Sequence, residues 1–110
     1  MPVITVVAAP HDRVGELLVA VADGVADALA LGHGDVIVTL VPSGPSATSG
    51  STGAASVSRW PIVTIHGSDR GSAKMNAARA SAEAAVRDWS RENDVECEGV
   101  WTQWLTPLPE

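Results

Sequence analysis

The chain of 110 residues contains no phenylalanine, no tyrosine and a single cysteine, Cys97. One cysteine forms neither an internal disulfide nor a cysteine-based metal site, which fits a reducing compartment. The longest apolar runs, at 3–10 and 36–42, are far shorter than the roughly 18–20 residues of a membrane span, and the first residues lack the basic flank and apolar core of a signal peptide. We therefore expect a cytoplasmic protein with no membrane partner.

Positive charge is also scarce. The chain has 7 lysines and arginines against 13 acidic residues, a formal net charge of -6, so binding to nucleic acid through phosphate contacts is not expected. Hydrophobic residues make up 45% and charged residues 18% of the chain, as in ordinary globular proteins. This length and composition predict one domain spanning residues 1–110.

The first 41 residues read as a strand, a helix and a second strand. A short β-branched run over 2–8 predicts a buried strand. From Val14 to Leu29 apolar residues recur at spacings of three and four, as on one face of a helix, with Asp12 as the expected N-cap and Gly32 as the expected stop. A second apolar run, 36–41, predicts another buried strand.

The same order returns after a connector over 42–60, whose Pro, Ser, Gly and Thr content predicts flexibility. Pro61 begins a run that repeats the pattern at Pro2: proline, two aliphatic residues, threonine and an aliphatic residue. A helix that buries Trp89 is expected after Asp69 and Ser72, and a strand over 95–105. Residues 2–41 and 61–105 are therefore predicted to be two tandem β-α-β units.

Two such units predict an α/β (α+β) fold, a four-stranded sheet with two helices on one face. The first two strands are apolar at consecutive positions, as in strands buried on both faces, yet the sequence has no further helix to cover the second face. We therefore expect the helix-free faces of several copies to pack together around a symmetry axis.

Pro2 is the expected catalytic residue. Initiator methionine is commonly removed before a small second residue, and removal of Met1 would leave Pro2 as a free secondary amine at the start of a buried strand. Burial disfavours the charged ammonium and lowers the pKa of such an amine toward neutrality. A base that titrates near the working pH suits proton abstraction next to a carbonyl.

The N-terminal Met-Pro, the short β-branched strand, an arginine just before a long helix and the repeat from Pro61 resemble the tautomerase superfamily, which includes 4-oxalocrotonate tautomerase. The resemblance covers nearly the whole chain. It implies a fused pair of β-α-β units assembled as a homotrimer, with Pro2 as general base of a tautomerase acting on an enol or 2-oxo acid. It implies no cofactor.

The resemblance also implies arginines that hold a substrate carboxylate, because the guanidinium matches two carboxylate oxygens. Arg70 and Arg13 precede the two predicted helices, although Arg13 lies about two residues later than the usual motif. His11 and His66 end strands that would line the rim of a pocket, and Trp101 is a candidate for the pocket wall. His11, His33 and His66 lack the paired spacing of metal ligands, so we expect no metal.

Two other functions remain open. The related dehalogenases, hydratases and decarboxylases act on short unsaturated or oxo acids, usually with an added acidic residue that activates water. Glu96 and Glu98 are the candidates for that role, and alternation along a strand would place them on one face. The second alternative is a non-catalytic oligomeric binding module, which stays open because the chain lacks Tyr and Phe and has no arginine in its second strand, where single-unit enzymes of the superfamily have one.

Overall fold

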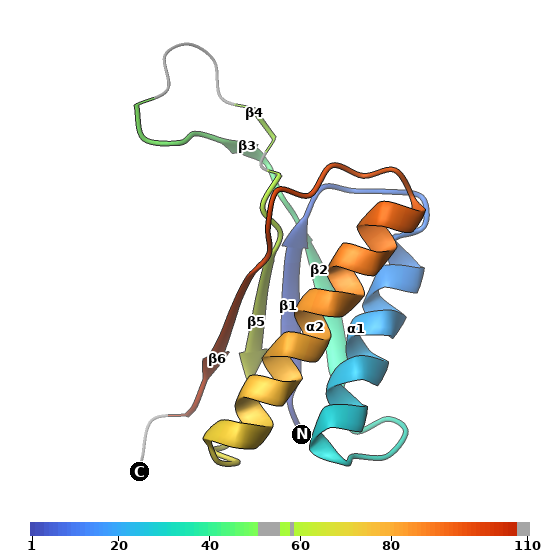
Figure 1. Ribbon diagram of the computed structural model, residues 1–110, viewed down its shortest axis with the longest axis vertical. Coiled ribbons are helices and arrows are strands. Elements are labelled where there is room, and N and C mark those ends of the chain that lie inside the picture. The colour runs from blue at the N-terminus through green and yellow to red at the C-terminus, as the bar shows by residue number, and fades with distance from the viewer. Residues whose placement is uncertain (51–55, 58, 108–110) are drawn as a thin grey trace.

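The structure, a computed structural model, describes residues 1–50, 56–57 and 59–107. Two long helices lie side by side on one face of a sheet (Figure 1). In chain order the elements are β1 (Val3–Ala8), α1 (Val14–Leu29), β2 (Ile37–Pro42), β3 (Pro45–Ser46), β4 (Ser56–Val57), β5 (Ile62–His66), α2 (Ser72–Glu92) and β6 (Trp101–Leu105).

The four-stranded sheet has the order β2-β1-β5-β6. Each β-α-β unit contributes a parallel pair, with Val3 opposite Ile37 in the first and Ile62 opposite Trp101 in the second. The two units meet through β1 and β5, which are antiparallel, with Val3 opposite His66. The predicted fold class, a four-stranded sheet with two helices on one face, is therefore confirmed.

The core lies between this sheet and the two helices. Alternate residues of β1 and β5 point inward, and they meet the apolar faces of α1 and α2. Trp89 is buried as predicted. The core consists of Ile4, Val6, Leu17, Val21, Val25, Leu29, Val63, Ile65, Ala78, Ala82, Val86, Trp89 and Val100.

The helix α1 spans Val14–Leu29 as predicted, but the cap residues of the helices differ from the prediction. The N-cap of α1 is Arg13 rather than Asp12, and its C-cap is Ala30, which is left-handed with φ 56° and precedes the expected stop at Gly32. The N-cap of α2 is Gly71, whose φ of 87° suits glycine, and the Asp69 side chain caps the preceding loop instead by accepting a hydrogen bond from the Gly71 N–H (2.9 Å).

Two segment predictions also need correction. The last strand begins at Trp101 rather than at residue 95, because residues 95–100 cross from the end of α2 over the end of the sheet before β6 starts. The connector 42–60 contains regular structure: β3 and β4 pair as a two-stranded antiparallel sheet beyond the end of the main sheet. Residues 51–55 and 58 of the connector lie outside the described residues.

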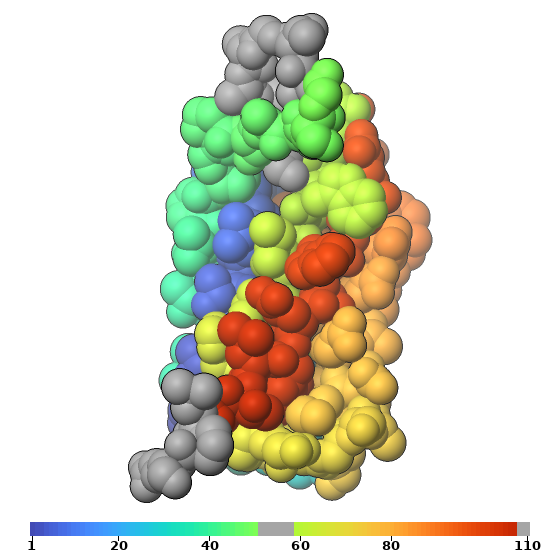
Figure 2. All heavy atoms as spheres, turned by 90° about the vertical axis from the view of Figure 1, so that its left-hand side faces the viewer, coloured from blue at the N-terminus to red at the C-terminus, as the bar shows by residue number. Residues whose placement is uncertain are grey.

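The helix-free face of the sheet is open in the single chain, and Figure 2 views this face. Val3, Ile37 and Val41 are exposed on it, as expected for a sheet with no further helix to cover this face, and its burial against other copies stays a prediction. The register arranges the outward residues in three rows across the sheet. These rows are Ile37-Val3-His66-Leu105, Thr39-Thr5-Thr64-Gln103 and Val41-Val7-Ile62-Trp101.

Among the described residues, neither helix is apolar enough over a sufficient length to cross a bilayer.

Candidate functional site

Pro2 lies at the end of the sheet where β1 begins. Its ring is fully buried, and its carbonyl oxygen accepts a hydrogen bond from the Ile37 N–H (3.3 Å). Met1, which precedes it, is 69% exposed. Because β1 and β5 are antiparallel, the loop from β5 to α2 reaches this same end, with His66 opposite Val3. The fold thus brings Arg70, in that loop, to the Pro2 end.

Arg70 has an unusual environment. Its Nε is buried and has no hydrogen-bond partner among the described residues. A buried donor without a partner is unfavourable, because desolvation is not offset by a new hydrogen bond. The position also precedes the N-terminus of α2, where unpaired backbone N–H groups and the helix dipole favour an anion. Arg70 is therefore suited to receive a carboxylate.

Two hydrogen bonds hold the start of the loop that carries Arg70 against β6. The Trp104 indole N–H donates to the carbonyl oxygen of Gly67 (3.2 Å), and the Gly67 N–H donates to the carbonyl oxygen of Leu105 (3.1 Å). These bonds attach the start of the loop to β6. Trp101, and not Trp104, was the candidate named from the sequence. Alternation along a strand places the two on opposite faces, and the start of β6 at Trp101 decides which of them faces the helices.

Trp101 lies at the other end of β6 and on the open face, where it is 60% exposed. Within one chain it is therefore not placed beside Pro2. Its predicted contact with substrate needs a neighbouring subunit to bring it there, and it stays a prediction.

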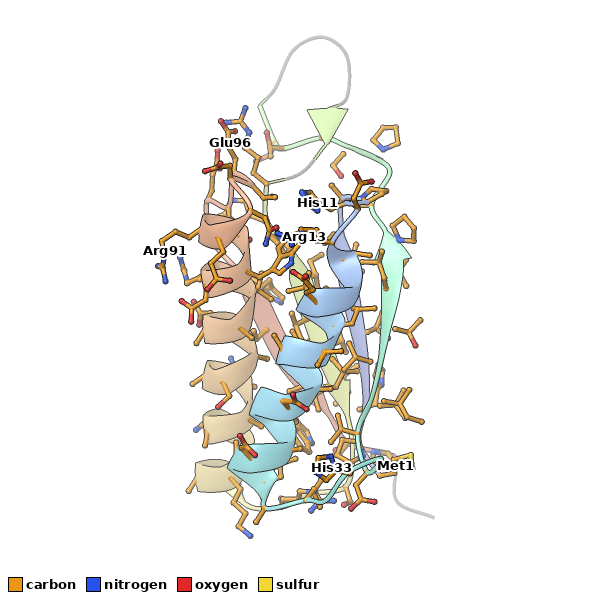
Figure 3. All side chains as sticks on the ribbon, turned by 90° about the vertical axis from the view of Figure 1, so that its right-hand side faces the viewer. Met1, His11, Arg13, His33, Arg91 and Glu96 are labelled. Carbon is orange, nitrogen blue, oxygen red and sulfur yellow. The ribbon has the colours of Figure 1, made fainter. Side chains whose placement is uncertain are left out.

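Arg13 and His11 also lie at the end opposite Pro2, as Figure 3 shows by the labelled His11, Arg13 and Met1. The Arg13 side chain is exposed and pairs with Glu16 (Nε to Oε1, 3.6 Å). His11 Nδ1 accepts a hydrogen bond from the Arg13 N–H (3.0 Å), and its ring packs edge-on against Trp89 with centroids 5.0 Å apart. The single chain therefore unites Arg70, but neither Arg13 nor His11, with Pro2.

The two glutamates considered for water activation do not lie in a strand. Both contact Arg59: Glu96 Oε2 is 2.8 Å from Arg59 Nε, and Glu98 Oε1 is 3.6 Å from Arg59 Nη1. In addition, the Trp60 indole N–H donates to Glu98 Oε2 (3.3 Å). Like Arg13, this cluster lies at the end away from Pro2, where Figure 3 labels Glu96.

Arg79 was not singled out from the sequence. It lies half-buried on α2, and its guanidinium donates to the hydroxyl (3.4 Å) and carbonyl (3.3 Å) oxygens of Thr102 on the edge strand β6. A surface pocket of about 510 Å³ beside it also includes Trp104 and Gln103. The sequence did contain a sign of this contact, because Arg79 directly follows Ala78 on the buried side of the predicted helix.

The three histidines do not form one cluster. Figure 3 places His33 near Met1 and His11 at the far end, while His66 is exposed at the end of β5. Within the described ranges, no group of three or more His, Cys, Asp or Glu side chains is arranged to hold a metal ion.

The sequence matches no protein-family model and no curated protein. Solved structures do resemble it over nearly its whole length. A fused 4-OT, solved as an asymmetric trimer, has a TM-score of 0.77 at 14% identity, covering 96% of this chain and 85% of that one. The macrophage migration inhibitory factor of Toxoplasma gondii has a TM-score of 0.61 at 22% identity, covering 98% and 90% of the two chains.

This chain has the tautomerase-superfamily fold. A malonate semialdehyde decarboxylase, described as having decarboxylase and hydratase activities, shares the fold as well, with a TM-score of 0.66, 14% identity and coverage of 96% and 84%. Proteins with this fold therefore catalyse different reactions, so the reaction of this chain has to be inferred from its own residues.

Proposed function

We propose that the chain is a cofactor-free tautomerase in which Pro2, freed by removal of Met1, moves a proton on an enol or 2-oxo acid. The position of Pro2 supports this role, because a secondary amine at the start of a buried strand has little access to water. In the reaction the amine takes a proton from the substrate and returns one to a different atom, which leaves the enzyme unchanged.

The main observation behind the proposal is the buried Nε of Arg70, which has no hydrogen-bond partner among the described residues and lies at the same end of the sheet as Pro2. A substrate carboxylate supplies the missing acceptor, and it places the adjacent carbon skeleton next to the base. Charge-assisted pairing of this kind is stronger than a neutral hydrogen bond and fixes orientation.

We further propose that the protein is a homotrimer. The open face of the sheet presents two mainly apolar rows, one of which includes His66, with three threonines and Gln103 between them, a pattern suited to burial against another copy. Neighbouring folds solved as trimers support this assembly. A neighbouring subunit would also be the means of bringing Arg13, His11 or Trp101 to the Pro2 end.

Two measurements on protein made without an N-terminal tag test the function. Intact mass shows whether Met1 is removed, and ketonisation of phenylenolpyruvate reports proton transfer. Replacing Pro2 with Ala should lower kcat by at least about 100-fold, as loss of a general base does. Arg70→Gln should mainly raise KM. The matched control Arg91→Gln removes an exposed arginine paired with Asp88 and should leave both constants unchanged.

Retention of Met1, or full activity in Pro2→Ala, would refute the proline mechanism. Retained Met1 together with no ketonisation would support the non-catalytic binding module instead.

The second candidate, a decarboxylase or hydratase of a short oxo or unsaturated acid, is favoured by the likeness to malonate semialdehyde decarboxylase. Against it, both glutamates considered for water activation pair with Arg59 at the far end of the chain. Release of CO₂ from a 3-oxo acid, lost in Pro2→Ala, would select this reaction over tautomerisation.

A further inference from the structure

A second cavity, of about 360 Å³, lies at the end of the sheet opposite Pro2. Its size is at the lower end of the roughly 300–1,000 Å³ typical of small-molecule sites. It lies where Pro61 starts the second unit, between the end of β1, the two helices and the segment after α2. The apolar part of its wall consists of Ala8, Ala9, Leu17, Val86, Trp89 and Val95.

Trp89 contributes an aromatic ring to the wall of this cavity. Its indole N–H already donates to the carbonyl oxygen of Arg13 (3.1 Å), and only 7% of the residue is exposed. The small part of the ring that stays exposed therefore offers a ligand an apolar contact and no unsatisfied donor. His11 supports the ring from its edge, which fixes its orientation.

Arg59 and Glu96 are the charged residues that line the same cavity. Their side chains form an ion pair at 2.8 Å, but they are 57% and 70% exposed. Ion pairs this open to water contribute little to stability, because solvent screens them. Glu98 Oε1 also lies 3.6 Å from Arg59 Nη1 and stays beside it, while a carboxylate from a ligand can replace that of Glu96 at the Nε of Arg59 at small cost.

The cavity lies beside Pro61, which occupies the position in the second unit that Pro2 occupies in the first. When Pro2 is matched with Pro61, Arg70 of the second unit corresponds to His11 of the first, so the first unit has a histidine where the second has its arginine. Arg59, two residues before Pro61, supplies a cation instead. The nitrogen of Pro61 is an amide within the chain and cannot act as a base.

We propose that this cavity binds a small monocarboxylate with an apolar tail and does not transform it. The carboxylate pairs with Arg59 in place of Glu96, and the tail lies against Trp89 and Leu17. Within one chain the site lies at the opposite end of the sheet from Pro2 and Arg70, and its binding does not require the proposed tautomerase activity.

Isothermal titration of the unmodified protein with 3-phenylpropanoate tests the proposal. Binding should be measurable, and 3-phenylpropanamide, which lacks the charge, should bind at least about tenfold more weakly. Equal binding of acid and amide, or no binding of the acid up to its solubility, overturns the proposal.

Two variants at the cavity and three controls elsewhere locate the site. Arg59→Gln should weaken binding about tenfold, whereas Glu96→Gln should strengthen it about threefold, because it removes the competing carboxylate. The matched controls Arg91→Gln and Glu92→Gln make the same charge changes on exposed residues of α2 outside the cavity wall and should have no effect. Arg70→Gln should also leave binding unchanged.

The indole N–H signal of Trp89 in a ¹H-¹⁵N spectrum gives a readout that does not depend on activity. It should shift on addition of 3-phenylpropanoate, and Ala9→Leu, which fills part of the cavity, should abolish the shift while circular dichroism stays unchanged. Binding that is lost in Arg70→Gln but kept in Arg59→Gln would place the ligand at the Pro2 end and refute the second site, without bearing on the function of Pro2.

Discussion

The indole N–H of Trp104 donates a hydrogen bond to the carbonyl oxygen of Gly67, at 3.2 Å. The ring lies so close to Gly67 that a Cβ there would be 3.0 Å from its nearest carbon. This contact joins the edge strand to the loop that carries Arg70. It links the proposed carboxylate binding to a residue that does not itself need to touch substrate.

We predict that Trp104→Phe loosens this loop. The phenylalanine ring keeps much of the packing but has no N–H to donate, so amide hydrogen exchange over residues 67–71 should become faster. KM should rise more than kcat falls, because Arg70 is positioned less well. Trp101→Phe, at the other end of the same strand, is the control and should leave exchange in this loop unchanged. Equal loop protection in both variants would contradict the positioning role.

We predict that position 99 has to be glycine, because the Trp60 ring leaves no room for a side chain there. The Trp60 ring occupies the space that a Cβ at position 99 would fill. Gly99→Ala should therefore lower the free energy of unfolding by about 1–3 kcal/mol, as overpacking does, in urea denaturation. The comparison is Gly15→Ala in α1, where nothing lies within 4 Å of the added Cβ, and which should raise stability by about 0.5–1 kcal/mol.

A double-mutant cycle checks the cause of the Gly99 effect. If the clash is responsible, Gly99→Ala should cost much less in a Trp60→Ala background, because the two residues are in contact. An unchanged cost would trace the effect to backbone conformation instead.

The open sheet face is predicted to be the subunit interface. Ile62 lies in the apolar row next to Trp101, on a strand inside the sheet. Ile62→Glu should convert the oligomer to a folded monomer, because burial of an unpaired carboxylate is costly. Sedimentation velocity with circular dichroism separates dissociation from unfolding. Val19→Glu, at an exposed position of α1, should keep the oligomer intact; dissociation of this control, or an intact Ile62→Glu oligomer, would contradict the assignment.

Arg79 is predicted to fix α2 to the edge strand. Its bonds to Thr102 are partly shielded from water, so Arg79→Ala should cost about 1.5–3 kcal/mol of unfolding free energy. Arg87, whose partner Glu83 lies one turn away on the same exposed helix face, is the comparison. Arg87→Ala should cost less than about 0.5 kcal/mol. Thermal unfolding of the two variants measures the difference, and equal losses would show that Thr102 contributes nothing specific.

The order of the elements was readable from the sequence for a physical reason. The spacing of apolar residues from Val14 to Leu29 follows the helix period, and the β-branched runs after Pro2 and Pro61 are too short for helices. Element ends were less accessible, because they depend on single dihedral angles and local bonds. Ala30 in the left-handed conformation ends α1 although glycine stands two residues later, and nothing in the composition indicated it.

In the candidate site, too, some features could be predicted from the sequence and others could not. Pro2 and Arg70 were identified from local pattern and resemblance, and that Arg70 lies at the Pro2 end follows from the antiparallel pairing of β1 with β5. The choice of Trp101 over Trp104 could not be made reliably without the start of β6, since a shift of one residue moves every side chain to the other face.

The sequence by itself determined the two β-α-β units, because these depend on periodicity and on the order of residues along the chain, and it pointed to Pro2 as the candidate catalytic residue. Only the tertiary structure decided which groups share an end of the sheet. The antiparallel meeting of the units places Arg70 with Pro2, and Arg13, His11 and Arg59 with Pro61. Strand direction across the sheet is a long-range property, set by how the two units pack and not by the residues of either unit alone.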